Sequence, residues 1–180
     1  MDADADRVTD LANVLDEVGR LIDSLREQQW SARTPCDDWD VRALVDHLLD
    51  LQRTFQSNLT GQTVPPISDY RSSVAALIAA FQADGALQRT VPDRLGDISG
   101  LTSLNILITE HLAHGWDLAR AIGVTPSFDE TVTNRAIEFA RALGPTLPPQ
   151  LRRFKDSRPV ADDAPAIDRL AALLGRTVTT

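Results

Sequence analysis

The residues of this chain with the greatest capacity for chemistry are its three histidines and its single cysteine. Two of the histidines, His111 and His114, lie in one short run with an acidic residue, Glu110. Glu110 and His114 are four residues apart, so a helix would place their side chains one turn apart on the same face. The third histidine, His47, lies far upstream, at the edge of the apolar stripe of another helical pattern.

A carboxylate and an imidazole on one helical turn, together with an imidazole from a facing helix, have the composition of a catalytic zinc site. Such sites use three protein ligands and leave a position open for water or substrate. The same groups also accept nickel or iron, because affinity alone does not select the metal. A Glu–His pair at this spacing can equally be a simple hydrogen-bonded pair, and His47 can be a boundary residue of the core. Burial of Glu110 on an apolar helix without a cation or proton would be costly, which favours the metal site.

The other candidate residues point less clearly to chemistry. Cys36 is expected near a helix N-terminus, where acidic neighbours offset the helix dipole, and we interpret it as a buried structural residue. Asp117 and Arg120 are three residues apart and can pair with one another. We interpret the tryptophans as packing groups rather than as a platform for substrate; they are Trp30, Trp39 and Trp116.

Helical periodicity dominates the elements that must position these residues. Apolar residues recur at three- and four-residue steps in six segments. We predict helices over residues 7–28, 41–59, 68–83, 101–122, 127–143 and 165–174. The 101–122 segment is apolar over most of its circumference, so it should be central and buried. The fold class is therefore all-α, most simply one domain over residues 1–180 that forms a four-helix bundle with short accessory helices.

Local signals mark the expected ends of these helices. Asp38 or Asp40 can cap the helix that begins at residue 41, and a capping box from Ser127 to Glu130 should begin the fifth helix. Gly123 and Gly175 should follow helix ends. Between the helices, residues 88–100 read as a connection with short extended pieces. Residues 147–163, which include Arg152, Arg153 and Arg158, should be irregular.

Composition narrows the classes of function. The 180 residues are 43% hydrophobic and carry a net charge of -8, and an acidic chain of this kind is not expected to bind nucleic acid. No segment is long and apolar enough for a membrane span, and the acidic N-terminus does not look like a signal peptide. The lone cysteine permits no internal disulfide. We therefore expect a cytoplasmic protein.

Three stretches of the sequence carry a family resemblance. Residues 30–47 contain a Thr-Pro-Cys loop, then Trp-x-Val, then a helix with His47. Residues 110–123 begin with Glu-His-Leu-Ala-His, and residues 163–176 end in Leu-Leu-Gly-Arg. Together they resemble the DinB/YfiT-like metalloenzyme superfamily, in the short branch related to the N-terminal metal-binding domain of mycothiol-dependent maleylpyruvate isomerase.

This resemblance implies a four-helix bundle with an unusual helix order and a divalent metal at one end. Carried over to this sequence, the family ligands are His47, Glu110 and His114, whereas His111 is not a ligand by the motif. Zinc is the metal we expect first, with nickel or iron as alternatives. The resemblance also implies a low-molecular-weight thiol such as mycothiol as cosubstrate, whose thiol would be the nucleophile, and a small electrophilic substrate.

The reaction is less closely defined than the site. The isomerase has an additional C-terminal domain with an arginine required for activity, and these 180 residues have no room for it, so we do not expect maleylpyruvate isomerisation itself. The leading hypothesis is a metal-dependent thiol transferase or isomerase. The alternatives are a non-catalytic helical protein that binds a small ligand or partner around a structural metal, and a metal-assisted hydrolase. Assembly as a homodimer stays open.

Overall fold

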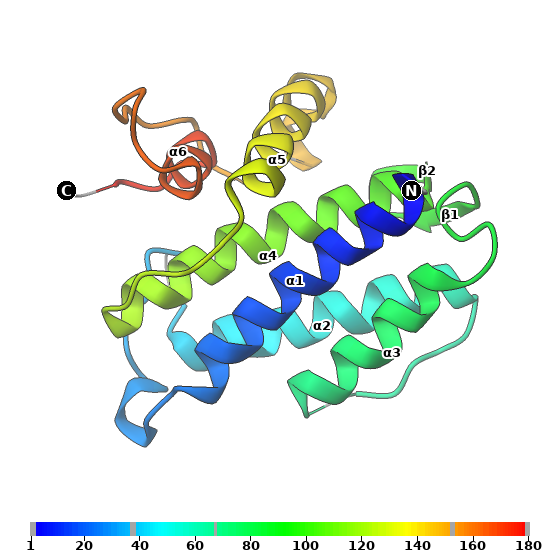
Figure 1. Cartoon of the computed structure of the whole chain (residues 1–180), viewed down its shortest axis with the longest axis horizontal. Coiled ribbons are helices and arrows are strands. Elements are labelled where there is room, and N and C mark those ends of the chain that lie inside the picture. Colours follow the sequence, from blue (N-terminus) through cyan, green and yellow to red (C-terminus); the bar gives the residue numbers. More distant parts are fainter. Residues whose placement is uncertain (1–2, 37–38, 67, 152–153, 179–180) are drawn as a thin grey trace.

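Four helices pack side by side in the computed structural model of the chain (Figure 1), which describes residues 3–36, 39–66, 68–151 and 154–178. They are α1 (Ala3–Asp23), α2 (Val41–Thr60), α3 (Tyr70–Gln82) and α4 (Gly100–Ile122). Both α1 and α2 pack against α3 and α4, so α1 lies diagonally opposite α2, and α3 lies diagonally opposite α4. The predicted all-α bundle and its unusual helix order are confirmed.

Two further helices cover the outer side of α4, as Figure 1 shows. They are α5 (Glu130–Leu143) and α6 (Ala166–Leu173), which pack against each other and against α4. With α1 and α2 on one side and α5 and α6 on the other, α4 is buried along most of its length. This explains why apolar residues occupy most of its circumference, because a helix buried on all sides has no solvated face.

The connections between helices contain small regular elements. The predicted extended pieces form an antiparallel hairpin of β1 (Thr90–Asp93) and β2 (Gly96–Ser99), with Thr90 opposite Ser99. Three short 3-10 helices complete the structure: η1 (Glu27–Gln29), η2 (Gly144–Thr146) and η3 (Pro149–Leu151). Among the described residues, none of the helices has the length and apolar character that a membrane span requires.

Most helix ends follow their sequence signals. The Asp40 carboxylate accepts a hydrogen bond from the backbone N–H of Ala43 (2.9 Å) and caps α2, whereas Asp38 lies outside the described residues. The helix predicted from residue 68 begins at Tyr70, because the Asp69 side chain caps it. Gly123 ends α4 in the left-handed conformation with φ of +73°, a region that favours glycine.

Two predicted boundaries are wrong. The first helix ends at Asp23 rather than near residue 28, and the chain then turns into η1. The capping box at Ser127 does not form, because the Ser127 backbone N–H instead donates to Glu17 on α1 (2.6 Å). The cap of α5 is Asp129, and Glu130 accepts a hydrogen bond from the Ala166 N–H (3.0 Å) at the beginning of α6. Hydrogen bonds to α1 and α6 therefore replaced the local capping box that the sequence predicted.

Candidate metal centre

The three predicted ligands meet between α2 and α4. These helices pack against each other and run in opposite directions (Figure 1). His47 lies in the second turn of α2, and His114 lies about two thirds of the way along α4. One donor atom from each of His47, Glu110 and His114 lies within 4.8 Å of the other two. The imidazole rings of His47 and His114 meet edge to face with centroids 5.0 Å apart.

The packing of each helix explains how the ligands reach this position. Leu44 and Leu48 of α2 are fully buried, and His47 lies half-buried at the edge of the stripe that they form, as its spacing predicted. On α4, Glu110 and His114 are one turn apart and only 8% and 3% exposed. The burial of both helices holds the ligand set on rigid backbone, which positions donors more closely than a loop would.

One pair of donors already has the separation found around a tetrahedral divalent ion. The His114 Nε2 and Glu110 Oε2 atoms are 3.3 Å apart. With metal–ligand bonds of roughly 2.0–2.1 Å, the edge of a tetrahedron is about 3.3 Å, so this pair already has the separation that zinc requires. Two imidazole nitrogens and one carboxylate oxygen are also the donor types that zinc, nickel and iron accept.

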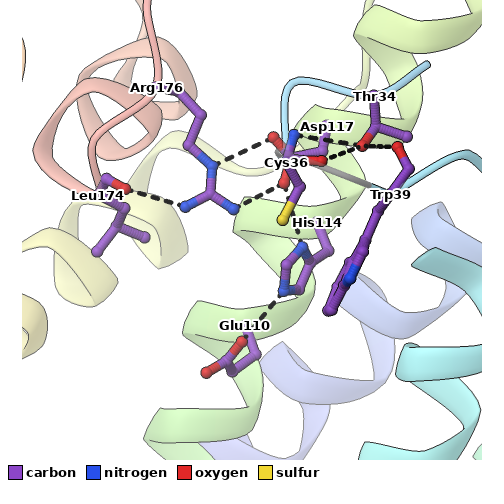
Figure 2. Close-up of polar contacts among 8 residues, drawn as sticks. All are labelled: Thr34, Cys36, Trp39, Glu110, His114, Asp117, Leu174 and Arg176. Atoms are coloured by element: carbon purple, nitrogen blue, oxygen red, sulfur yellow. Dashed lines mark hydrogen bonds and ion pairs between the residues drawn. The ribbon is translucent and has the colours of Figure 1, made fainter. Parts of the chain in front are cut away.

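The second nitrogen of His114 is held by a buried carboxylate. The Nδ1–H of His114 donates to Oδ2 of Asp117 (3.1 Å), as Figure 2 shows. In the protonated imidazole the Nε2–H faces Glu110, and loss of that proton frees Nε2 to bind a metal. Metal-binding histidines commonly have such a carboxylate on the other ring nitrogen, because it fixes the tautomer and the ring orientation.

Asp117 is in turn held by the C-terminal segment. Arg176 donates to both oxygens of Asp117, from Nη2 (2.7 Å) and from Nε (3.2 Å), and also to the carbonyl of Leu174 (3.0 Å) (Figure 2). Gly175, which follows α6 as predicted, has φ of +90°, and this turn aims Arg176 at α4. The pairing proposed between Asp117 and Arg120 is wrong as the main contact, since Asp117 faces Arg176.

The loop before α2 places two more side chains over His114. The Thr34 hydroxyl donates to the Trp39 carbonyl (3.0 Å) and accepts from the Cys36 N–H (3.2 Å), which closes the loop (Figure 2). The Trp39 ring then lies 4.6 Å from the ring of His47 and 5.7 Å from that of His114, between centroids. Trp39 is a packing group as predicted, but its partners are two candidate ligands.

Cys36 is half-buried at this site rather than buried in the core as predicted. Burial, with the Asp117 carboxylate as a further cause, raises the pKa of its thiol, so the thiol is protonated at neutral pH. Cys36, His114 and Asp117 form a second group of donors within 4.8 Å. Because Arg176 already occupies both oxygens of Asp117, the set with His47 and Glu110 is the better candidate for a metal.

The electrostatics keep both carboxylates ionised. Burial alone would raise the pKa of Glu110, but the hydrogen bond and charge of His114 outweigh it and lower that pKa. Burial likewise opposes ionisation of Asp117, and its bonds to His114 and Arg176 lower its pKa instead. Burial would lower the pKa of His114, whereas Asp117 and Glu110 raise it. Because Arg176 balances the charge of Asp117, Glu110 is the buried anion of this cluster that a divalent cation would neutralise.

His111 is not part of this cluster. Its Nδ1 atom bonds the carbonyl of Leu107 (2.9 Å) and its Nε2 atom faces the amide of Gln52 (3.3 Å). Burial, with no ionised partner in these bonds, lowers its pKa to about 4. His111 is therefore a neutral, hydrogen-bonded core residue, in agreement with its absence from the family ligand set.

A cavity of about 810 Å³ adjoins the three donors. Its wall includes His47, Glu110 and His114, together with Cys36 and Trp39 of the loop. Polar and charged side chains line much of the remainder: Asp50, Thr54, Asn58, Asp93, Arg94, Lys155, Arg158, Arg176 and Thr177. The donors thus face a space large enough for a small polar molecule. Of the arginines in the predicted irregular segment, Arg158 lines this cavity, whereas Arg152 and Arg153 lie outside the described residues.

The sequence did not reveal three residues of this site: Trp39, Asp117 and Arg176. Asp117 could have been found, because it lies three residues after His114 on the same helix. Arg176 and Trp39 carry no such signal, since their contacts with α4 depend on how distant segments pack.

Helical bundles commonly bind metals or cofactors through side chains that project from facing helices. The two imidazoles and the carboxylate beside this cavity place the protein, by its architecture, among helical bundles with a candidate metal centre. Comparison with known proteins narrows this class. Residues 11–70 match the family described as the mycothiol maleylpyruvate isomerase N-terminal domain, which belongs to the DinB-like superfamily. The predicted resemblance to this domain is confirmed over these residues. The matched residues include His47, whereas Glu110 and His114 lie beyond them.

Two curated relatives cover most of the chain. They are the uncharacterized proteins MT0763 and Rv0738 of Mycobacterium tuberculosis, from the strains CDC 1551 / Oshkosh and ATCC 25618 / H37Rv. Each is 29% identical over 170 residues, which span 91% of this chain and 93% of the relative. No solved structure matches the chain significantly.

Proposed function

We propose that this protein is a metal-dependent thiol transferase or isomerase, which uses a mycothiol-type thiol and acts on a small electrophilic substrate. The observation that carries the proposal is the set of His47, Glu110 and His114, whose donor atoms lie within 4.8 Å of one another and face a cavity of about 810 Å³. The family match supports the thiol, because it is to a mycothiol-related domain.

In this proposal the three donors hold a divalent metal, with zinc as the first choice and nickel or iron as alternatives. When bound, such an ion supplies a Lewis acid that lowers the pKa of a neighbouring thiol or water. Asp117 keeps the His114 ring oriented through Nδ1, and Arg176 keeps Asp117 in place. The Trp39 ring, packed on both histidines, covers one side of the cluster and limits access of water from there.

The cavity favours a catalytic over a purely structural metal. Structural zinc sites are closed by four protein ligands, whereas catalytic sites have three and an open position. Here three donors line a cavity, and the nearby Cys36 thiol has a raised pKa, so it is poorly suited to be the nucleophile. A thiol from a cosubstrate would fill that role.

Metal analysis tests the site assignment. Protein purified without an affinity tag should contain about one divalent ion per chain by mass spectrometry of the metals. We expect His47→Ala and His114→Ala to lose most of this metal. His111→Gln is the matched control, because His111 lies on the same helix but bonds Leu107 and Gln52, and it should retain the metal. Full stoichiometry in the first two variants would show that the assignment is wrong.

A thiol-dependence assay tests the reaction class. Metal-loaded protein is mixed with an electrophilic bimane and, in parallel, with mycothiol, bacillithiol, glutathione or no thiol. We expect formation of the thiol adduct with at least one thiol, and its loss in His47→Ala. Consumption of an activated ester at the same rate with and without thiol would instead indicate a metal-assisted hydrolase. A stoichiometric metal with neither activity would indicate the non-catalytic alternative.

A further inference from the structure

A second cavity of about 570 Å³ adjoins the polar one, and Glu110 lines both. The two cavities have six wall residues in common: Arg94, Ile106, Glu110, Phe154, Lys155 and Leu174. They therefore adjoin, and Glu110 faces both. A molecule in the second cavity would lie next to the candidate metal ligands without occupying the space in front of His47 and His114.

The second cavity differs from the first in chemistry. Its own wall is largely apolar and comes from α5, α6 and the segment after η2: Phe139, Ala140, Leu143, Leu147 and Leu173, with Leu95 from the hairpin. These residues are only half-buried, so the cavity leaves apolar surface in contact with solvent. Its volume lies within the range of roughly 300–1,000 Å³ that small-molecule sites occupy, and such sites are mostly apolar with a few polar groups.

The charged side chains of this cavity are mainly cationic. Arg94, Arg141 and Lys155 line it, against the acidic Asp156 and the candidate ligand Glu110. Three cations against two anions contrast with the net charge of -8 for the whole chain. Arg141, in the last turn of α5, lines the cavity and is exposed, so it belongs to the solvent-accessible part of the wall. An anionic group at the solvent side of the cavity would find a favourable potential there.

We infer that the second cavity binds the electrophilic substrate, and that this substrate is a small molecule with an apolar body and an anionic group. The inference rests on the proposed function, in which the polar cavity takes the thiol. The apolar body would pack against Phe139 and Leu143, with the anionic group near Arg141. The end that faces Glu110 would then lie at the boundary with the polar cavity, where a thiol can reach it.

Two fluorescent probes with the same aromatic body test the inference. 1-Anilinonaphthalene-8-sulfonate is anionic, and N-phenyl-1-naphthylamine is its neutral analogue. We expect each to bind one saturable site per chain. Ala140→Phe, which fills the cavity from α5, should weaken both probes at least tenfold. Leu147→Phe, outside the helices, is a second filling variant with the same expected result. Val124→Phe is the matched control, because it adds the same ring at an exposed position after α4 and should change neither affinity.

The charge is tested separately. Arg141→Gln should weaken the anionic probe severalfold and leave the neutral probe unchanged, and raised salt should mimic this effect on the wild type. Unchanged binding of both probes in the two filling variants would overturn the cavity as the site. If Arg141→Gln affects both probes equally, or affects neither, the inference that the ligand carries an anionic group near Arg141 is wrong.

The same titrations are repeated in His47→Ala, which lacks a proposed metal ligand. We expect the probes to bind this variant as they bind the wild type. Failure of the metal or thiol assays with intact probe binding would therefore refute the proposed function, and the second cavity would remain a binding site for an apolar anion without the role of a substrate site. Loss of the probe site with intact metal binding would refute this inference alone.

Discussion

Replacement of Arg176 by Met tests whether the C-terminal segment holds a candidate metal ligand in place. Arg176 and Asp117 form a bidentate pair whose side chains are 7% and 0% exposed. Loss of one partner leaves a buried charge without its counterion, which typically costs about 3–5 kcal/mol of unfolding free energy. Because Asp117 retains its bond from His114, we expect the lower end of this range, about 3 kcal/mol.

The chain offers a matched control for this variant. Arg71 and Asp23 have the same N···O distance of 2.7 Å, but their side chains are 40% and 59% exposed. An exposed pair contributes only about 0–1 kcal/mol, because water and salt screen it. Arg71→Met should therefore lower the unfolding free energy far less than Arg176→Met, although the two variants remove the same group.

The effect on metal affinity is the second readout. Loss of a carboxylate or of its support behind a metal-binding histidine typically lowers affinity by about 10–100-fold, or roughly 1.4–2.7 kcal/mol. We expect a loss within this range in Arg176→Met and in Asp117→Asn, and none in Arg71→Met. In the double variant the two losses should not add, since both changes remove the same interaction. Competition with a chromophoric chelator measures the affinity, and urea unfolding measures the stability.

The two readouts separate the possible errors. If Arg176→Met loses no more stability than Arg71→Met, the buried pair does not have the strength that its geometry implies. If stability falls but metal affinity is unchanged, Arg176 stabilises the fold without positioning His114. Additive losses in the double variant would show that Asp117 and Arg176 act independently, which would refute the connection between them.

Three further predictions follow from single side chains. The pKa of His111 is near 6.5 in the unfolded chain but about 4 in the folded protein, so unfolding takes up a proton between these pH values. His111 should therefore lower the unfolding free energy by about 3 kcal/mol as the pH falls from 6.5 to 4. Urea titrations at stepped pH should show that His111→Leu loses this contribution. Gly175→Ala should destabilise the fold by about 1 kcal/mol or more, because φ is +90° there, and should weaken metal binding by displacing Arg176; a chelator titration with unchanged affinity would contradict this. Added Ni²⁺ should quench the fluorescence of Trp39 beside His47, so Trp39→Phe should lose most of the quenching and Trp30→Phe should retain it.

The helices were largely predictable because their signals are local. Apolar periodicity located all six, and the α2 cap at Asp40 was among the predicted ones. The errors arose where a distant segment competed for a local group. Ser127 could cap a helix by its sequence, but its backbone bonds to Glu17 of α1, and Glu130 serves the beginning of α6. A prediction from neighbouring residues cannot include such partners.

The candidate site also has a part that local spacing predicts and a part that depends on packing between distant segments. Glu110 and His114 were placed together by their four-residue spacing, His47 was proposed as the imidazole from a facing helix, and the family resemblance selected the same three residues. Their convergence within 4.8 Å depends on the antiparallel packing of α2 on α4. The assignment of a metal to them stays a prediction that metal analysis must test.

The sequence by itself determined the helices, the acidic composition and the donor types, because spacing along one helix decides which side chains share a face. Only the tertiary structure decided what surrounds those donors. It brought Trp39 from a loop and Arg176 from beyond α6 to the same turn of α4, and it formed a polar and an apolar cavity that both include Glu110 in their walls. The physical reason is that these contacts join residues far apart in the chain, and burial of apolar surface on the six packed helices, rather than any local preference, brings them together.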